Sequence, residues 1–204
     1  HVHVHVHVHV HVHVHVHVWL ACEARAIAAP TVAGTLVPIA RYIDWITTTP
    51  LLMYELGHLA HASTANTMML VGSDILMIAA GILSACLDRQ RQYRMMLFYF
   101  AVSCVFYVVM LCIINVRLAN GTVLQQTDSV QELFGYLKVL TSTVWTFYPI
   151  VVFLGRAQCH LISKNTEDCL LCLLDITAKL GVEGLIIAFA VFRVEDAEGS
   201  DGSA

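Results

Sequence analysis

The sequence predicts an all-α membrane protein, and three observations lead to this class. Hydrophobic residues make up 58% of the 204 residues and charged residues only 13%, whereas soluble domains carry about 25% charged residues. The formal net charge of −4 offers no basic surface to a nucleic acid. From Pro38 onward the chain divides into five apolar stretches, each close to the ~20 residues that a helix needs to cross hydrocarbon. These observations exclude a soluble enzyme, a disordered chain and a disulfide-stapled domain.

The N-terminal region does not belong to this pattern. Residues 1–18 are a strict His-Val alternation, which we interpret as a low-complexity tract. A metal-binding tract is the alternative, because imidazoles two residues apart in a strand share one face and can share an ion. Residues 19–37 are rich in alanine and contain Pro30 and Gly34, which predicts a loop or a poorly defined lead-in.

The helical part of the chain is expected at residues 38–194. Its apolar stretches cover about 38–57, 67–87, 95–116, 136–155 and 168–193. Polar links separate them, the longest being a predicted loop over residues 117–132. Residues 195–204 are acidic and contain glycine and serine, which predicts a flexible tail.

Ionisable residues inside the spans are the main functional signal, because charge in a bilayer is costly and marks function by default. Arg41, Asp44, Thr48 and Glu55 follow one another at steps of three, four and seven, so they share one helical face. Asp44 and Glu55 are separated by about 16 Å along that helix. In the last span Asp175 and Lys179 are four residues apart.

A buried lysine loses its proton, pairs with an acid or becomes covalently bound, and a desolvated lysine amine is the usual former of a Schiff base. Ion pairs that serve only structure are the alternative for Arg41 with Asp44 and for Asp175 with Lys179. Two acids, one arginine and one lysine together favour a functional site.

Four runs of residues resemble one family. Residues 41–52 (RYIDWITTTPLL), 70–77 (LVGSDILM), 145–149 (WTFYP) and 173–179 (LLDITAK) are similar to the third, fourth, sixth and seventh helices of microbial (type 1) rhodopsins. The order and spacing also match. The resemblance implies the seven-helix microbial rhodopsin fold, of which only the third to seventh helices are recognisable. The chain is therefore expected to lack the first two helices.

The resemblance implies roles for the ionisable residues. Lys179 would bind all-trans retinal as a protonated Schiff base, with Asp44 as counterion and proton acceptor and Asp175 as second counterion. Arg41 would lie just extracellular of these groups, and Thr48 would donate a hydrogen bond to the acceptor.

Two further carboxyls complete the implied proton path. Glu55 would be the cytoplasmic proton donor, and Glu167 matches one of two acids used in proton release. The trio Asp44, Thr48 and Glu55 has the pattern of proteorhodopsin- and bacteriorhodopsin-like proton pumps. Glu183, one turn beyond Lys179, has no counterpart in the family pattern and receives no role.

A larger group of residues matches positions of the family's retinal pocket, where rigid aromatic side chains suit a polyene. These are Tyr42, Trp45, Thr49, Leu52, Met77, Gly81, Trp145, Tyr148 and Pro149.

The function implied is a light-driven outward proton pump rather than an enzyme, with the lipid bilayer, retinal and protons as partners and homo-oligomerisation left open. A sensory photoreceptor, a light-gated channel and a non-functional truncated fragment are the alternatives, and Glu55 favours the pump. Orientation is open to two predictions: the count of arginines places the link at residues 88–94 in the cytoplasm, whereas the resemblance places it outside.

Overall fold

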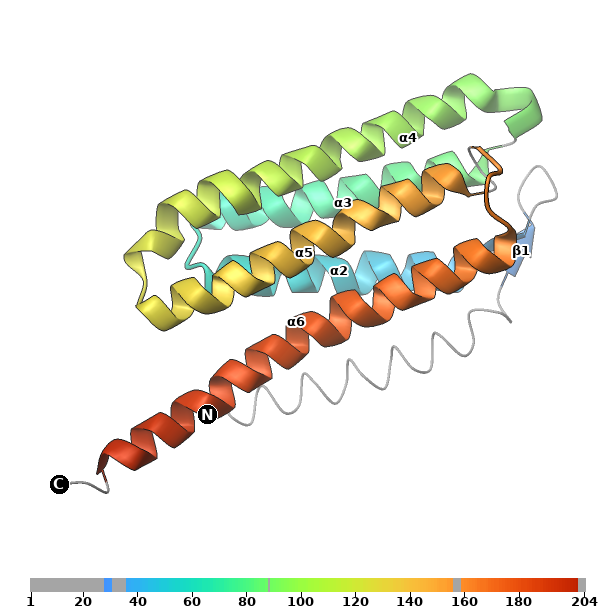
Figure 1. The fold of residues 1–204 in the computed structure, drawn as a ribbon. Coiled ribbons are helices and arrows are strands. Elements are labelled where there is room, and N and C mark those ends of the chain that lie inside the picture. Colours follow the sequence, from blue (N-terminus) through green and yellow to red (C-terminus); the bar gives the residue numbers. More distant parts are fainter. Residues whose placement is uncertain (1–27, 31–35, 88, 156–158, 202–204) are drawn as a thin grey trace.

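The computed structural model describes residues 28–30, 36–87, 89–155 and 159–201, and in this part of the chain five long α-helices form one bundle (Figure 1). The predicted low-complexity tract at residues 1–18 lies outside the described residues. The helices are α2 (Ile39–Leu59), α3 (Thr64–Cys86), α4 (Arg89–Cys112), α5 (Asp128–Leu154) and α6 (Lys164–Asp201).

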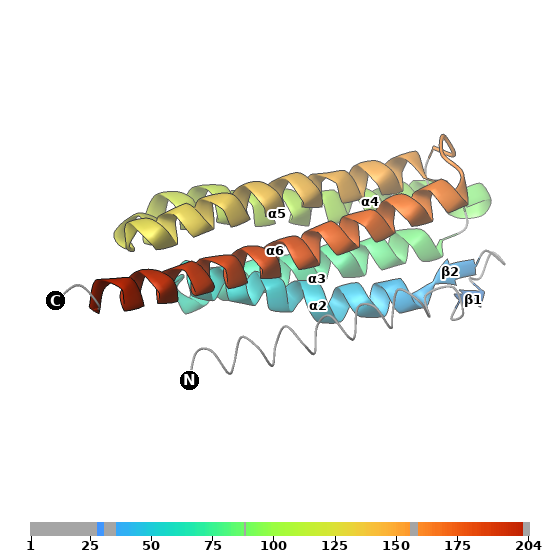
Figure 2. The same cartoon turned by 60° about the horizontal axis from the view of Figure 1, so that its bottom comes forward.

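A short hairpin precedes the bundle. Strand β1 (Ala28–Pro30) pairs antiparallel with β2 (Leu36–Pro38), and Ala29 lies opposite Val37. Both strands fall largely in the region expected to be a loop or lead-in. The hairpin lies at the end of the bundle where α2 and α6 begin (Figure 2).

Local chemistry explains where some helices start and bend. The Ser63 Oγ accepts a hydrogen bond from the backbone N–H of Asn66 at 3.3 Å and caps α3. Pro50 lies inside α2 and Pro149 inside α5. Each proline lacks the N–H that would bind the carbonyl four residues earlier, which favours a bend at these points.

The predicted loop at residues 117–132 is mostly helical. The run of α4 continues as a π-helix, η1 (Ile113–Thr122), and a 3₁₀ turn, η2 (Val123–Gln125), and α5 already begins at Asp128. Its apolar side chains Ile114, Leu118 and Val123 are buried. Burial of these residues favours an ordered segment over the solvated loop that the polar composition predicts.

The C-terminal helix is also longer than its apolar stretch. Helix α6 continues to Asp201, so residues 195–201 of the segment expected to be flexible are helical. Residues 202–204 lie outside the described residues.

The interior of the bundle is apolar and draws on every helix. Among the most buried side chains are Met53 of α2, Leu70 of α3, Met110 of α4, Phe134 of α5 and Ala178 of α6, each at most 2% exposed. Such a core fixes the relative positions of the helices that carry the ionisable residues.

The outer surface is apolar as well. Met68, Phe98, Val105, Val139 and Leu173 are all more than half exposed, which suits contact with lipid rather than water. Among the described residues, three helical runs are long and apolar enough to cross a membrane: Thr64–Cys86, Arg91–Gln125 and Asp128–Leu154. Helices α2 and α6 carry the ionisable residues. The protein is an integral, multi-pass membrane protein.

Candidate functional site

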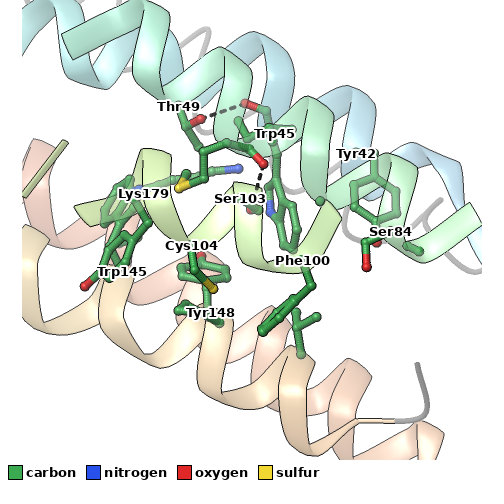
Figure 3. A pocket seen from close by; sticks show the side chains of 18 residues that line it. Tyr42, Trp45, Thr49, Ser84, Phe100, Ser103, Cys104, Trp145, Tyr148 and Lys179 are labelled. Carbon is green, nitrogen blue, oxygen red and sulfur yellow. Dashed lines mark hydrogen bonds between the residues drawn. The ribbon is translucent and has the colours of Figure 1, made fainter. Parts of the chain in front are cut away.

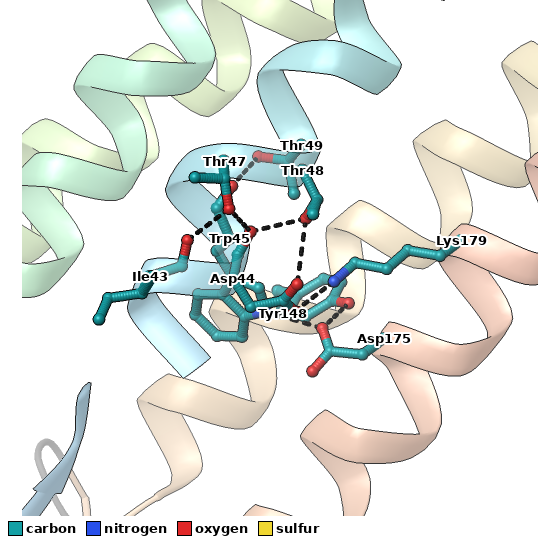
Figure 4. Close-up of polar contacts among 9 residues, drawn as sticks. All are labelled: Ile43, Asp44, Trp45, Thr47, Thr48, Thr49, Tyr148, Asp175 and Lys179. Carbon is teal, nitrogen blue, oxygen red and sulfur yellow. Dashed lines mark hydrogen bonds and ion pairs between the residues drawn. The ribbon is translucent and has the colours of Figure 1, made fainter. Parts of the chain in front are cut away.

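The centre of the site is an ion pair between α2 and α6. The Lys179 ammonium contacts the Asp44 carboxylate inside the bundle (Figure 4), and their side chains are only 5% and 9% exposed. A buried charge is tolerated when it has a partner, and removing one partner costs about 3–5 kcal/mol. The sequence places these residues 135 positions apart, and the parallel course of α2 and α6 brings them together.

Threonines surround Asp44 on α2. Thr48 Oγ1 donates to the Asp44 carbonyl oxygen at 2.7 Å and lies 3.5 Å from its carboxylate Oδ1. Thr47 Oγ1 likewise donates to the Ile43 carbonyl oxygen, and Thr49 Oγ1 lies 2.9 Å from the Trp45 carbonyl oxygen. These bonds hold the helical turn before Pro50, and Thr48 lies where the sequence predicts a partner of the Asp44 carboxylate.

Asp175 forms the second carboxylate of the site. Its Oδ1 accepts hydrogen bonds from Trp45 Nε1 at 2.7 Å and from the Tyr148 hydroxyl at 2.6 Å (Figure 4). The two aromatic rings also meet edge to face, with ring centroids 5.4 Å apart. Asp175 therefore ties α6 to both α2 and α5, one turn before Lys179.

Arg41 has a partner that the sequence analysis did not identify. Its Nη1 donates to Asp168 Oδ1 at 3.0 Å, at the end of the bundle where α2 and α6 begin. Asp168 precedes Asp175 by seven residues, and Lys179 follows Asp175 by four. The three residues therefore lie on one face of α6. That spacing could have identified Asp168 from the sequence.

Glu167 and Glu55 lie apart from the ion pair. Glu167 is in the first turn of α6 and lies directly over Gly155, where a methyl group on the glycine Cα would come within 2.5 Å of the Glu167 carboxyl carbon. Glu55 is half-buried, eleven residues beyond Asp44 on the same face of α2, or about 16 Å along the helix. The structure thus brings together Asp44, Asp175, Thr48 and Lys179, but not Glu55.

A cavity of about 110 Å³ lies beside Lys179, and all five helices line it (Figure 3). Most residues predicted for a retinal pocket line it: Tyr42, Trp45, Thr49, Met77, Gly81, Trp145, Tyr148, Pro149 and Lys179. Leu52 instead packs in the core, where it is 2% exposed.

Helix α4 contributes a wall that the sequence analysis missed. Phe100, Ser103, Cys104 and Tyr107 line the cavity. They recur at steps of three, one and three, which is the spacing of one helical face. The helix is apolar on all sides, so the sequence does not mark this face as the inward one, and no family-like run of residues covers the helix.

Asp74 forms a separate buried polar contact beside the cavity. It is completely buried, and its Oδ2 accepts a hydrogen bond from Thr49 Oγ1 at 2.7 Å. Within the described structure its Oδ1 has no hydrogen-bond partner. Among the described residues, Thr49 is therefore the donor to the Asp74 carboxyl, which is buried away from water.

Thr49→Val should destabilise the protein by about 1–3 kcal/mol, because it leaves a buried acceptor unsatisfied. Unfolding of the protein in lipid discs, followed by helical circular dichroism, measures the change. Thr47→Val is the matched control: Thr47 is exposed and bonds only backbone carbonyls, so we expect a loss below about 0.5 kcal/mol. Equal losses in the two variants would show that the Asp74 contact contributes nothing.

A comparison with known protein families shows the family to which this chain belongs. A family model described as bacteriorhodopsin-like protein matches residues 4–194 of the chain. The chain belongs to the bacteriorhodopsin-like family. This confirms the resemblance predicted from the sequence, and members of the family bind retinal as their chromophore.

Individual members of the bacteriorhodopsin-like family support the assignment. Archaerhodopsin-3 of Halorubrum sodomense is 32% identical over 176 residues, which are 85% of this chain and 66% of the relative. Cyanorhodopsin N2098R of Calothrix sp. NIES-2098 has a similar structure, with a TM-score of 0.74, 28% identity and coverage of 79% of this chain and 69% of that one. The light-driven proton pump LR (Mac) of Leptosphaeria maculans gives a TM-score of 0.71 at 26% identity, over 78% of this chain and 63% of that one.

The bacteriorhodopsin-like relatives differ in function and are longer than this chain. A sensory rhodopsin and a halorhodopsin are also among the similar proteins. The chain spans 57% to 66% of the length of archaerhodopsin-3, archaerhodopsin-2 and bacteriorhodopsin. The comparisons therefore establish the family and leave the activity to be argued from the site.

The residues of this bacteriorhodopsin-like site fit retinal. A single lysine amine projects from α6 at a cavity whose walls are largely aromatic or apolar (Figure 3). A carboxylate already contacts that amine, so a positive charge on the nitrogen has a partner in the dry interior. Trp45, Trp145 and Tyr148 supply flat surfaces for a conjugated chain.

Proposed function

We propose that this chain is a light-driven outward proton pump that binds all-trans retinal through Lys179. The single observation that carries the proposal is the buried contact between Lys179 and Asp44 beside the five-helix cavity. An amine in this position has an apolar cavity on one side and a proton-accepting carboxylate on the other.

Bound retinal supplies light absorption and a protonated nitrogen whose proton affinity falls on illumination. Asp44 takes up the released proton, because it already contacts the nitrogen atom of Lys179. Thr48 holds the turn that carries Asp44. Asp175, fixed by two aromatic donors, stays as a second negative group near the nitrogen.

The two ends of α2 give the path a direction. Arg41 and Asp168 form an ion pair on one side of Asp44, with Glu167 beside them in the first turn of α6. This side suits proton release. Glu55 lies on the other side of Asp44, on the same face of α2, where its carboxyl would serve as the proton donor. Two carboxyls on one helix thereby serve as acceptor and donor.

Illumination of the chain in cell membranes tests the proposal. After addition of all-trans retinal, a visible absorption band should appear, and light absorbed by that band should acidify the external medium. A protonophore should abolish the acidification. A chain that forms no band, as expected of a non-functional fragment, would overturn the proposal.

A sensory photoreceptor is the second candidate, because a sensory rhodopsin is among the relatives. A sensor would form the band and cycle without net proton movement. A light-gated channel would conduct in whichever direction the proton gradient drives, so reversing the gradient would reverse the pH change. Retention of the sign of acidification against an opposing gradient supports the pump.

Outward pumping requires that α2 and α6 begin on the extracellular side. We expect a cysteine at Gln92, near the start of α4, to react with an impermeant thiol reagent on intact cells, whereas one at Gln125 should not. Both glutamines are exposed, so the two positions differ in which end of the bundle they lie at and not in their access to the reagent. The native cysteines are first replaced by serine. Labelling at Gln125 alone would mean that the chain inserts in the opposite orientation and cannot pump outward.

A further inference from the structure

The second ion pair of the site joins the interior of the bundle to its surface. Arg41 Nη1 donates to Asp168 Oδ1 at 3.0 Å, and the two side chains are 12% and 39% exposed. The Arg41 guanidinium therefore lies largely inside the bundle, while the Asp168 carboxylate that binds it reaches the surface. The pair lies at the end of the bundle where α2 and α6 begin, which is the outward direction of the proposed pump.

The Arg41 side chain has two carboxylates within its reach. Arg41 precedes Asp44 by three residues, and side chains at this spacing on a helix have Cβ atoms about 5–6 Å apart. Its flexible aliphatic stem would let the guanidinium bind Asp44. In the structure it binds Asp168, which precedes Lys179 by eleven residues, or about 16 Å along α6. The guanidinium is thus turned outward, away from the contact between Lys179 and Asp44.

The neighbouring acid Glu167 is directed differently. Its carboxyl lies over Gly155 at the end of α5, at a place that a side chain on residue 155 would occupy. Asp168 is the next residue of α6 and binds Arg41 of α2. Consecutive residues of a helix with 3.6 residues per turn point about 100° apart. Asp168 is therefore the acid of this pair that faces α2 and can hold Arg41.

The position of this guanidinium matters for the proton acceptor. In the proposed cycle Asp44 takes the proton from the nitrogen of Lys179, which it already contacts. An opposite charge within about 4–6 Å of an acid favours the charged form of that acid. A guanidinium beside Asp44 would therefore stabilise the carboxylate and oppose proton uptake. The outward position of Arg41 removes this competition.

We propose that Asp168 is a positioning residue that keeps the Arg41 guanidinium outward of Asp44, an inference that rests on the proposed pump function. Asp168 takes up no proton in this scheme, and it stays ionised while it pairs with Arg41. Asp44 receives the proton from the nitrogen of Lys179 and later loses it to the external medium. The ion pair keeps its partners throughout the cycle.

Asp168→Asn tests this role, because it keeps the shape of the side chain and removes the charge. The Arg41 guanidinium should then approach Asp44 and weaken its hold on the positive nitrogen. The dark visible band should shift to longer wavelength, by less than in Asp44→Asn. The population with a deprotonated nitrogen after a flash should fall by about tenfold, because an adjacent opposite charge changes the proton-binding equilibrium of an acid by about that factor or more.

Two comparison variants accompany Asp168→Asn. Asp168→Glu keeps the charge and should restore both the band and the flash signal. Glu132→Gln removes an exposed acid of α5 that Tyr136 bonds, and it should match the parent. A dark band and flash signal in Asp168→Asn equal to those of the parent would contradict the proposal.

A double-mutant cycle separates positioning from a structural role. Asp168 acts through Arg41 in this proposal, so Asp168→Asn should cause no further change in the band or the flash signal once Arg41→Gln is present. Equal effects of Asp168→Asn with and without Arg41→Gln would show that Asp168 acts independently of the guanidinium.

The retinal-free protein gives a direct measurement of where Arg41 lies. Solid-state NMR in lipid discs, with labelled arginine guanidinium nitrogens and aspartate carboxyl carbons, should show the contact between Arg41 and Asp168 in the parent and its loss in Asp168→Asn. A new contact between an arginine and an aspartate should appear in Asp168→Asn and disappear when Asp44→Asn is added. Absence of a new contact, or one that survives Asp44→Asn, would overturn the proposal.

The outcomes distinguish this inference from the pump itself. A parent chain that forms no visible band refutes the proposed function, whereas an ordinary band with parent behaviour in Asp168→Asn refutes only the positioning role. If Asp168→Asn fails to fold, Asp168→Cys in a chain without native cysteines carries the test, because residue 168 is exposed enough to be labelled in the folded protein. A sulfonate-bearing label should give parent behaviour and a neutral label the behaviour expected of Asp168→Asn. Identical behaviour of the two labelled forms would refute the positioning role.

Discussion

Lys179→Ala should abolish the visible absorption band that appears when all-trans retinal is added to the membrane-embedded chain. Alanine has no amine to bond retinal, and Lys179 is the lysine that lines the cavity among the described residues. The band should fall to the level of membranes that lack the protein, because retinal free in lipid absorbs at shorter wavelength. An absorption spectrum before and after retinal addition measures the effect.

Two control variants distinguish loss of the attachment site from loss of folding. Lys138→Ala removes a half-buried lysine of α5 that does not line the cavity, so its band should equal that of the parent. Lys179→Ala alone leaves the Asp44 carboxylate buried without its partner, at a cost of about 3–5 kcal/mol. The double variant with Asp44→Asn removes that charge and should fold better while still lacking the band. A band of ordinary intensity in either Lys179 variant would refute the attachment site.

Asp44→Asn should shift the visible band to longer wavelength and stop light-driven acidification. The Asp44 carboxylate contacts the nitrogen of Lys179, so its negative charge stabilises the positive nitrogen of the dark state. An amide of the same shape removes both that charge and the proposed proton acceptor. The spectrum and the external pH under illumination report the two effects separately.

Glu55→Gln is the matched comparison, because it changes a carboxyl on the same face of α2 about 16 Å away. Its dark spectrum should stay close to that of the parent, while recovery after a flash slows and azide restores it. If Asp44→Asn and Glu55→Gln shift the band equally, the assignment of acceptor and donor by distance from Lys179 is wrong. If Glu55→Gln recovers at the parent rate, Glu55 is not the donor.

The sequence was most informative where polar residues occur against an apolar background. The steps between Arg41, Asp44 and Glu55 predict a shared helical face, and in the structure Asp44 is buried and the other two are partly buried along that face. The spacing of Asp175 and Lys179 similarly predicts neighbours on α6. Charges are rare in spans because they are costly, so their periodicity stands out from a single sequence.

Contacts between helices were harder to predict. Nothing in the sequence alone pairs Arg41 with Asp168, because the pair depends on how α2 and α6 are aligned and not on either helix by itself. The α4 wall of the cavity was missed for a related reason. Ser103 and Cys104 lie in a helix that is apolar on all sides, so hydrophobic periodicity does not reveal which face is inward.

The continuation of α4 into η1 and η2 could not be predicted from local composition. Arg117, Asn120 and the neighbouring polar residues have the composition of a loop, and composition alone favours one. Burial of Ile114 and Leu118 against neighbouring helices overrides that local preference. Tertiary packing of this kind is absent from any window of the sequence.

The helical run formed by α4, η1 and η2 is longer than the hydrocarbon core of a bilayer is thick. The run Arg91–Gln125 contains 35 residues, which span about 50 Å at 1.5 Å per residue, against a hydrocarbon core of about 30 Å. Tilting within the usual range of up to about 40° shortens the projection only to about 40 Å. The remainder must extend into the headgroup region and the water beyond it. The π-helical end of the run, with Arg117 and Asn120, therefore stands clear of the acyl chains, and hydrophobic mismatch at that end is relieved without deforming the membrane.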